Sequence, residues 1–392
     1  SLIPVEFANL GADGLVEVVD SDGGPDGTLL YRGTGLDDIF SVEAGTGTIG
    51  LRTRDGRHVD VATVDVGGLI LAAEDGDDEF NVQGPQPYNV IELEGGNPSA
   101  SDEANLTGDG TGLQVSMGES NGAATVTGGG MGTVNLSGTE VLNVDAASGD
   151  LDVAATDTDD AVEVTPLGEN EGMLTANGSS PVLNFENTDS FSVDTGDGND
   201  VLSVIGSSGA DTFSAGGSSV SIVGRETVNH SGVEALELYA RQGSDDINVT
   251  PSDIPVFVDG GDPLAGGFGD HLNVVAPEDE LEFLPGTDDD EGVYLVDGRA
   301  PVSFDGIETA GSETVAVVVE GQDGDDRITV VATGPNAFSV VLNGEADQTY
   351  TGVGELDIRG LGGNDQISVQ TIADWGVTVN VDGGEPAASD TL

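Results

Sequence analysis

The residues best suited to chemistry are oxygen-bearing side chains crowded into glycine turns. The densest turn is Gly196-Asp-Gly-Asn-Asp200, where Asp197, Asn199 and Asp200 bring three side-chain oxygen donors into four residues. Calcium takes about six to eight oxygen ligands and accepts carboxylates and turn carbonyls together. We therefore predict that this turn binds Ca²⁺.

Similar acidic turns occur at five other places in the chain. The further candidate ligands are Asp75, Asp77 and Asp78; Asp323, Asp325 and Asp326; Asn364 and Asp365; Asp245 and Asp246; and Asp37 and Asp38. A second interpretation needs no metal, because an aspartate in a turn also accepts hydrogen bonds from its own backbone and so starts a strand. The sequence leaves both interpretations open.

The stretch Thr195-Gly-Asp-Gly-Asn-Asp-Val-Leu-Ser-Val204 joins such a turn to a short strand. It resembles the calcium-binding nonapeptide of the RTX (hemolysin-type) family, Gly-Gly-x-Gly-x-Asp-x-hydrophobic-x, with Thr195 in place of the first glycine. The resemblance implies calcium bound at the turn and strands stacked as in a β-roll. The nonapeptides of RTX rolls follow one another directly, whereas the copies here are isolated.

The pattern Asp-x-hydrophobic-polar-hydrophobic repeats along the chain. Copies begin at Asp38, Asp78, Asp160, Asp200, Asp211, Asp245, Asp270, Asp326 and Asp365, with a degenerate copy at Asp102 and a shortened one at Asp390. Some neighbouring copies are separated by a short step of roughly 24 residues and others by a long step of roughly 40 residues, within a period of roughly 120 residues, and nested periods of this kind are typical of repeat architectures.

These spacings predict an all-β fold, an elongated parallel β-solenoid. A four-residue strand cannot bury its apolar face alone, but stacked strands from many coils can share one core. The short step would be one coil, and the long step two coils, the middle one lacking the motif. The repeat blocks would be 1–157, 158–310 and 311–392, the last incomplete.

The alternative fold is a string of tandem immunoglobulin-like β-sandwiches, because about 120 residues is also the size of one such domain. The glycine-rich stretch 108–138 would then be a domain junction.

Composition excludes several functions. The 392 residues include 73 acidic and 9 basic ones, all arginine, for a formal net charge of −64, which excludes nucleic acid as a partner. No apolar run is long enough to span a membrane, so we expect no membrane insertion. We find no catalytic motif and expect no enzyme; a polysaccharide lyase would need a basic groove that nine scattered arginines hardly supply.

We expect an extracellular structural protein at the cell surface, namely a segment of a surface layer, a filament or a giant surface protein, stabilised by calcium. The acidic, lysine-free repeats are similar in style to very large secreted bacterial surface proteins. The expected partners are copies of the chain itself or adjoining repeats, joined through Ser1–Phe7 and Leu392. The alternative is an adhesin that binds polysaccharide or another cell.

Overall fold

The computed structural model describes residues 15–20, 27–54, 56–98, 102–261, 269–288, 290–345, 347–384 and 390–392. The predicted all-β class is confirmed, since these residues form strands and turns and no helix. Accordingly, no helix in the described ranges is long and apolar enough to cross a membrane. The predicted terminal strand Ser1–Phe7 lies outside the described residues.

The chain falls into two units, which we describe separately: residues 1–200 with 228–232 (unit 1), and residues 201–227 with 233–392 (unit 2). The three repeat blocks 1–157, 158–310 and 311–392 stay a prediction, and their bounds differ from those of the two units.

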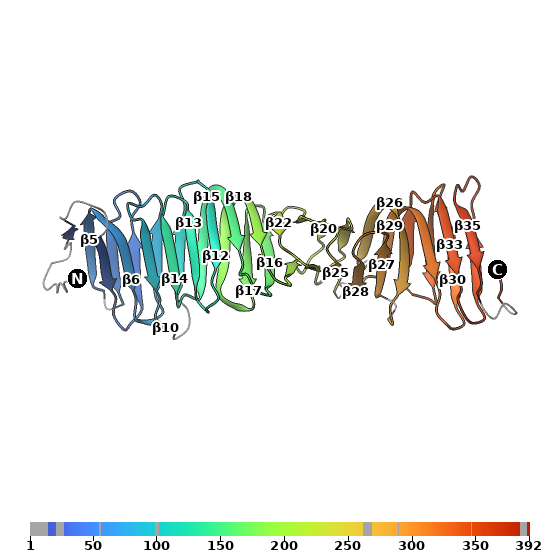
Figure 1. Ribbon diagram of the computed structural model, residues 1–392, viewed down its shortest axis with the longest axis horizontal. Coiled ribbons are helices and arrows are strands. Elements are labelled where there is room, and N and C mark those ends of the chain that lie inside the picture. The colour runs from blue at the N-terminus through green and yellow to red at the C-terminus, as the bar shows by residue number, and fades with distance from the viewer. Residues whose placement is uncertain are drawn as a thin grey trace. The chain divides into compact units, whose positions relative to one another are not determined.

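The strands of unit 1 lie in the blue to green part of Figure 1. They are β1 (Leu15–Val19), β2 (Gly27–Arg32), β3 (Asp38–Val42), β4 (Ile49–Thr53), β5 (His58–Val64), β6 (Val66–Ala72), β7 (Asp75–Gly76), β8 (Glu79–Gln83), β9 (Val90–Glu94), β10 (Asn97–Pro98), β11 (Glu103–Thr107), β12 (Leu113–Met117), β13 (Ala124–Gly128), β14 (Thr133–Ser137), β15 (Val141–Ala154), β16 (Ala161–Gly168), β17 (Glu171–Ala176), β18 (Ser179–Asp194) and β22 (Val228–Ser231).

The remaining strands belong to unit 2. They are β19 (Val201–Ile205), β20 (Thr212–Ala215), β21 (Ser219–Ile222), β23 (Ala235–Tyr239), β24 (Asp246–Val249), β25 (Val256–Asp259), β26 (His271–Pro285), β27 (Gly292–Val296), β28 (Val302–Asp305), β29 (Thr309–Glu320), β30 (Arg327–Gly334), β31 (Ala337–Leu342), β32 (Gln348–Thr351), β33 (Glu355–Arg359), β34 (Gln366–Gln370) and β35 (Thr378–Asp382).

Parallel ladders join equivalent strands of successive repeats in unit 1. Strands β3, β8, β11, β15 and β18 pair in register, so that Phe40, Phe80, Ala104, Leu142 and Leu183 form one column of facing residues. All five side chains are fully buried, and the Phe40 and Phe80 rings stack with centroids 5.5 Å apart. Each repeat thus supplies one apolar layer to a shared core.

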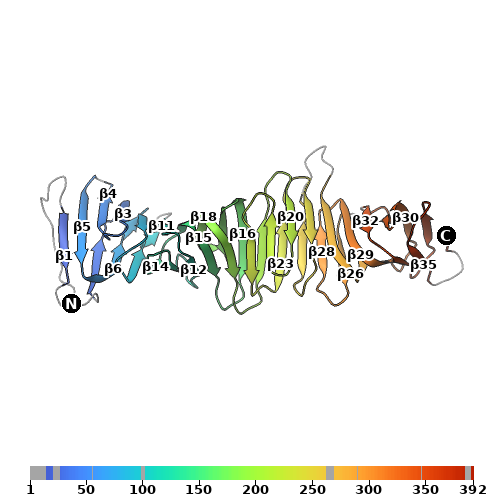
Figure 2. The ribbon, with the colours of Figure 1, turned by 90° about the horizontal axis from the view of Figure 1, so that it is seen from above.

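Unit 2 repeats the arrangement. Strands β20, β24, β26 and β29 pair in parallel and place Phe213, Ile247, Leu272 and Ala310 in a second buried column. Both views show β26 and β29 side by side (Figure 2).

The long steps of the repeat differ from expectation. Among the described residues between Asp38 and Asp78 there is no middle parallel coil; instead β3, β4 and β5 form an antiparallel meander. The same happens in β16–β17–β18 and β30–β31–β32. The reason is turn chemistry: Asn177-Gly178 closes a two-residue hairpin with φ of 55° and 59°, a geometry that favours Asn-Gly.

The structure agrees to different degrees with the two folds that the sequence predicts. Extensive parallel pairing does not match an immunoglobulin-like sandwich, whose sheets are antiparallel. The prediction of a domain junction at 108–138 is wrong. This stretch contains β12, β13 and β14, which pair with one another and with other strands inside unit 1. Apart from β7 and β10, which pair with each other, the described strands of each unit instead belong to a large mixed sheet.

Candidate functional site

The predicted metal ligands are divided between two environments. Apart from the shortened copy at Asp390, the aspartate that starts the strand of each motif copy is buried, at 4% exposed or less for Asp38, Asp78, Asp200, Asp245, Asp326 and Asp365. Asp37 is partly buried, and the other candidates are exposed: Asp75, Asp77, Asp197, Asn199, Asp246, Asp323, Asp325 and Asn364. Consecutive residues at a strand start point to opposite faces, so neighbouring carboxylates do not converge.

No group of three or more histidine, cysteine, aspartate or glutamate side chains in the described ranges is arranged to hold a metal ion. Two of these candidates have other contacts. Asp246 meets His271 Nδ1 at 2.9 Å, and Asp37 meets Arg54 Nη1 at 2.7 Å. Calcium binding at the acidic turns stays a prediction.

The buried aspartates instead form what we call aspartate rows, in which each backbone N–H donates to the carboxylate of the next member. In row 1 the N–H of Asp38 donates to Oδ1 of Asp78 (2.7 Å), and that of Asp78 to Oδ1 of Asp102 (2.8 Å). The N–H of Asp102 then donates to Oε2 of Glu140, at 2.7 Å. Hydrogen bonds to an ionised acceptor are about twice as strong as neutral ones.

Three more rows follow the same rule. Row 2 is Asp160 and Asp200 (2.8 Å); row 3 is Asp211, Asp245, Asp270 and Glu308 (2.6, 2.7 and 2.5 Å); row 4 is Asp326, Asp365 and Asp390 (2.9 and 3.0 Å). Each bond joins two residues that are far apart in sequence and belong to successive repeats. The rows therefore hold the repeats in register.

In the first member of each row, Oδ2 accepts a hydrogen bond from the backbone of the turn that precedes the strand. Oδ2 of Asp160, Asp211 and Asp326 accepts the N–H of the residue four positions earlier, at 2.9, 2.6 and 2.7 Å, and Asp38 does the same with Thr34. This is the turn capping that the sequence offered as the alternative to calcium.

A side chain from the following hairpin caps the other oxygen in three rows. Oδ1 accepts Nδ2 of Asn177 in row 2 (2.5 Å), Nη2 of Arg225 in row 3 (2.9 Å) and Nδ2 of Asn343 in row 4 (2.7 Å). Asn177 and Asn343 also accept the N–H of the residue after the aspartate, so each amide extends the strand pairing by one residue.

The surroundings of Oδ2 in the later members of the rows differ from those in the first members. Four residues before Asp78, Asp245 and Asp365 stand Glu74, Arg241 and Leu361, with left-handed φ of 81°, 75° and 67°. Here Oδ2 has no hydrogen-bond partner among the described residues, and the same holds at Asp102 and Asp270. These five carboxyl groups are 1% exposed.

Burial changes the acidity of four later members. It raises the pKa of Asp78 to about 7 and that of Asp270 to about 6. It also raises the pKa of Asp102 and of Asp245. Hydrogen bonds from the backbone oppose these shifts, while neighbouring carboxylates add to them, because a like charge disfavours ionisation.

An outer set of hydrogen bonds runs beside the rows. Oδ1 of Asp159 accepts the backbone N–H of Asn199 at 3.0 Å and its Nδ2 at 3.2 Å. Oδ1 of Asp325 accepts the same two groups of Asn364, at 2.8 and 3.0 Å. Three of the predicted ligand positions, Asn199, Asp325 and Asn364, thus take part in contacts between repeats.

Sequence reasoning missed the row ends and the caps. Glu140 and Glu308 follow the preceding member of their rows at one and the same spacing, and Asn177 and Asn343 follow the aspartates that they cap at another shared spacing. The equal spacing and the Asn-Gly dipeptide were the available signals. Arg225 has no such counterpart.

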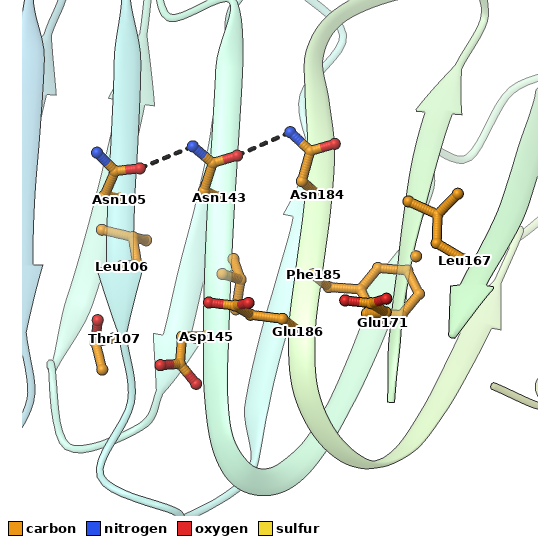
Figure 3. A pocket seen from close by; sticks show the side chains of 12 residues that line it. Asn105, Leu106, Thr107, Asn143, Asp145, Leu167, Glu171, Asn184, Phe185 and Glu186 are labelled. Atoms are coloured by element: carbon orange, nitrogen blue, oxygen red, sulfur yellow. Dashed lines mark hydrogen bonds between the residues drawn. The ribbon is translucent and has the colours of Figure 1, made fainter. Parts of the chain in front are cut away.

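The described residues also hold a groove on the outer face of β11, β15 and β18, with a volume of about 470 Å³ (Figure 3). Asn105, Asn143 and Asn184 line one side and form an amide ladder with Nδ2 to Oδ1 distances of 2.7 and 2.8 Å. Carboxylates such as Glu186 and the 60%-exposed Leu167 line the rest. The groove therefore combines amide and acidic groups with apolar side chains, and its charged groups are all acidic.

Comparison with known proteins gives no match: no family model matches the chain, and no curated protein does. The RTX-like character of Thr195–Val204 stays a prediction.

Proposed function

We propose that this chain is a structural segment of an extracellular surface protein, built as a parallel β-solenoid. The observation that carries the proposal is the row of bonds from Asp38 through Asp78 and Asp102 to Glu140. Residues at equivalent places in every repeat are used to bind the next repeat. This is the arrangement expected where stacking is itself the function.

Charge supports the surface assignment. A formal net charge of −64 makes chains repel one another, so their assembly suits a medium whose cations screen the repulsion. Buried columns such as Phe40, Phe80 and Ala104 supply the cohesion that offsets it. Assembly with adjoining repeats or with other copies follows from the same repeated contacts.

Removal of one complete repeat tests the solenoid. Deleting residues 79–102 brings Asp78 directly before Glu103, which starts the equivalent strand, and preserves the inward and outward alternation. We expect this variant to fold with a cooperative transition, whereas a deletion of 79–90 should unfold unit 1. Equal damage from both deletions would contradict the solenoid.

Immunogold labelling tests the location and role. Antibodies against the chain should decorate intact source cells in a continuous layer or along filaments. Labelling confined to permeabilised cells would contradict a surface role and leave the fold proposal standing.

The groove in Figure 3 favours a second candidate function, a polysaccharide-binding module. Its amides can bond to sugar hydroxyls, and its carboxylates exclude uronic acids by charge. Titration with neutral and with uronate polysaccharides tests this: Glu186→Ala should weaken binding of the neutral polymer, and Asp189→Ala, an exposed acid on the same strand, should not.

A further inference from the structure

The groove of Figure 3 offers more hydrogen-bond acceptors than donors. Nδ2 of Asn143 already donates to Oδ1 of Asn105 at 2.7 Å and to Oε1 of Glu103 at 2.5 Å. In the same way Nδ2 of Asn105 donates to Oδ1 of Asn81 at 3.2 Å and to Oε1 of Glu79 at 3.4 Å. Because a side-chain amide has two N–H donors and an oxygen with two lone pairs, both amides have used their donors and keep an acceptor. An occupant of the groove must therefore supply donors.

Three carboxylates line the other side of the groove, those of Asp145 on β15, Glu186 on β18 and Glu171 on β17 (Figure 3). Asp145 and Glu186 hold paired positions on neighbouring parallel strands, which lie about 4.8 Å apart. Like charges placed directly opposite each other destabilise a sheet. No arginine is among the lining residues, and within the described ranges neither Glu171 nor Glu186 has a hydrogen bond or ion pair. An occupant with positive charge would remove this repulsion.

The third component of the groove is apolar. Leu167 lines it with 60% of its surface exposed, and Figure 3 shows this side chain near Glu171 and Phe185. Phe185 is buried and stacks on Phe191 with ring centroids 4.2 Å apart, which fixes that wall of the groove. Leu167 can therefore pack against C–H groups of an occupant at the point where the acidic side begins.

We propose that the groove binds a polymer of amino sugars whose amines are free and protonated, such as a de-N-acetylated hexosamine chain. The proposal rests on the polysaccharide-binding role given above as the second candidate function, and it names the class of polysaccharide. Hydroxyl groups of the sugar donate to Oδ1 of the asparagines, ammonium groups meet the carboxylates, and the C–H face of a ring packs on Leu167. The volume of about 470 Å³ lies within the range of ligand pockets, about 300–1,000 Å³.

Other cationic occupants use fewer of these groups. A metal ion needs ligands that converge on one point, whereas the carboxylates are spread along the groove from Asp145 to Glu171 (Figure 3). A polyamine has ammonium groups but neither hydroxyl groups for the asparagines nor a ring face for Leu167. A neutral sugar leaves the repulsion between Asp145 and Glu186 in place. The amino sugar alone among these matches all three components of the groove.

Tetramers of glucosamine and of N-acetylglucosamine are matched probes, because they differ in the charge of the amine and share the sugar ring. Isothermal titration calorimetry at pH 6, with chelator present, measures the affinity of each for the whole chain. We expect the glucosamine tetramer to bind about tenfold more tightly, the gain that three exposed ion pairs give together. This preference should shrink as salt is added, because salt screens exposed charges.

Three variants locate the site. Glu186→Gln removes one charge and keeps the shape of the side chain, so it should weaken binding of the glucosamine tetramer about two- to fivefold and leave the acetylated tetramer unchanged. Leu167→Ser should weaken binding of both. Asp189→Asn is the matched control, because it makes the same charge change at an exposed position of β18 outside the groove and should alter neither affinity. Thermal unfolding of each variant shows whether the fold is retained.

The possible results separate the proposal from the role on which it rests. Equal binding of the two tetramers would overturn the amino-sugar assignment and leave polysaccharide binding standing, whereas binding of neither would overturn both. Equal losses in Glu186→Gln and Asp189→Asn would show attraction to the general charge of the chain and would exclude the groove as the site. Spermine that binds as tightly as the glucosamine tetramer, and loses affinity in Glu186→Gln, would assign the groove to polyamines instead.

Discussion

The backbone N–H of Asp78 donates to Oδ1 of Asp102 at 2.8 Å, and the two residues begin equivalent strands 24 positions apart. The carboxylate that starts one strand is therefore the acceptor for the strand before it. Since the same bond recurs in four rows, the start of a strand and the contact between repeats are one feature of the molecule.

Loss of a row acceptor should destabilise the fold. Asp200→Ala removes the acceptor of the Asp160 N–H, and an unsatisfied buried donor costs about 1–3 kcal/mol. We expect a melting temperature lower by about 2–4 °C for each kcal/mol. Asp200→Asn keeps an acceptor and should lose clearly less; equal losses in the two variants would show that the bond contributes little.

The cap of row 4 can be tested without straining the backbone. Asn343 has φ of 55°, which glycine adopts readily, so Asn343→Gly removes only the side chain. Asn343→Asp instead places a second carboxylate against Oδ1 of Asp326, now 2.7 Å from Nδ2. We expect the aspartate variant to be the less stable at pH 7, with the difference shrinking at acid pH once one of the two carboxylates takes up a proton. A difference independent of pH would rule out charge as the cause.

The close packing beside row 1 leaves no space for a Cβ at Gly95. In Gly95→Ala the new Cβ would meet a backbone carbonyl oxygen at 2.1 Å, which forces the chain to shift. We expect a loss of about 1–3 kcal/mol by denaturant unfolding. Gly35→Ala is the control, because nothing lies within 4 Å of its Cβ position. The size explanation would fail if Gly95→Ala were as stable as Gly35→Ala.

Calcium remains the cation that the exposed turns would select. If Asp197 and Asp323 contribute ligands, Ca²⁺ should raise the melting temperature more than Mg²⁺ at equal ionic strength, since flexible oxygen-rich turns suit calcium better. Chelator should reverse the gain, and Asp197→Ala should reduce it. Identical effects of the two ions would leave charge screening as the whole explanation.

Much of the fold was accessible from the sequence because its rules are local. Alternation in Asp38-Ile-Phe-Ser-Val42 predicts that Phe40 and Val42 share one face, and both are buried. The short steps of the repeat predict which strands are equivalent, and β8 does pair with β11 in register. The period alone does not predict the antiparallel hairpins within the long steps, because local turn chemistry such as that of Asn177-Gly178 decides them.

The candidate site was less accessible. Proximity in sequence suggested that Asp77 and Asp78 act together, yet the alternation of a strand sends one to solvent and the other inside. The partners of Asp78 are Asp38 and Asp102, which are distant in sequence and belong to the neighbouring repeats. No local rule selects those partners.

The sequence by itself determined where strands start, which side chains face the core and how often the unit repeats, since turn chemistry and alternation act over a few residues. Only the tertiary structure decided which carboxyl oxygen accepts a hydrogen bond and which has no donor within reach. That outcome depends on which N–H, amide or guanidinium the next strand or hairpin brings within about 3 Å. Such an encounter is fixed by strand register and turn shape together, and a short stretch of sequence encodes neither alone.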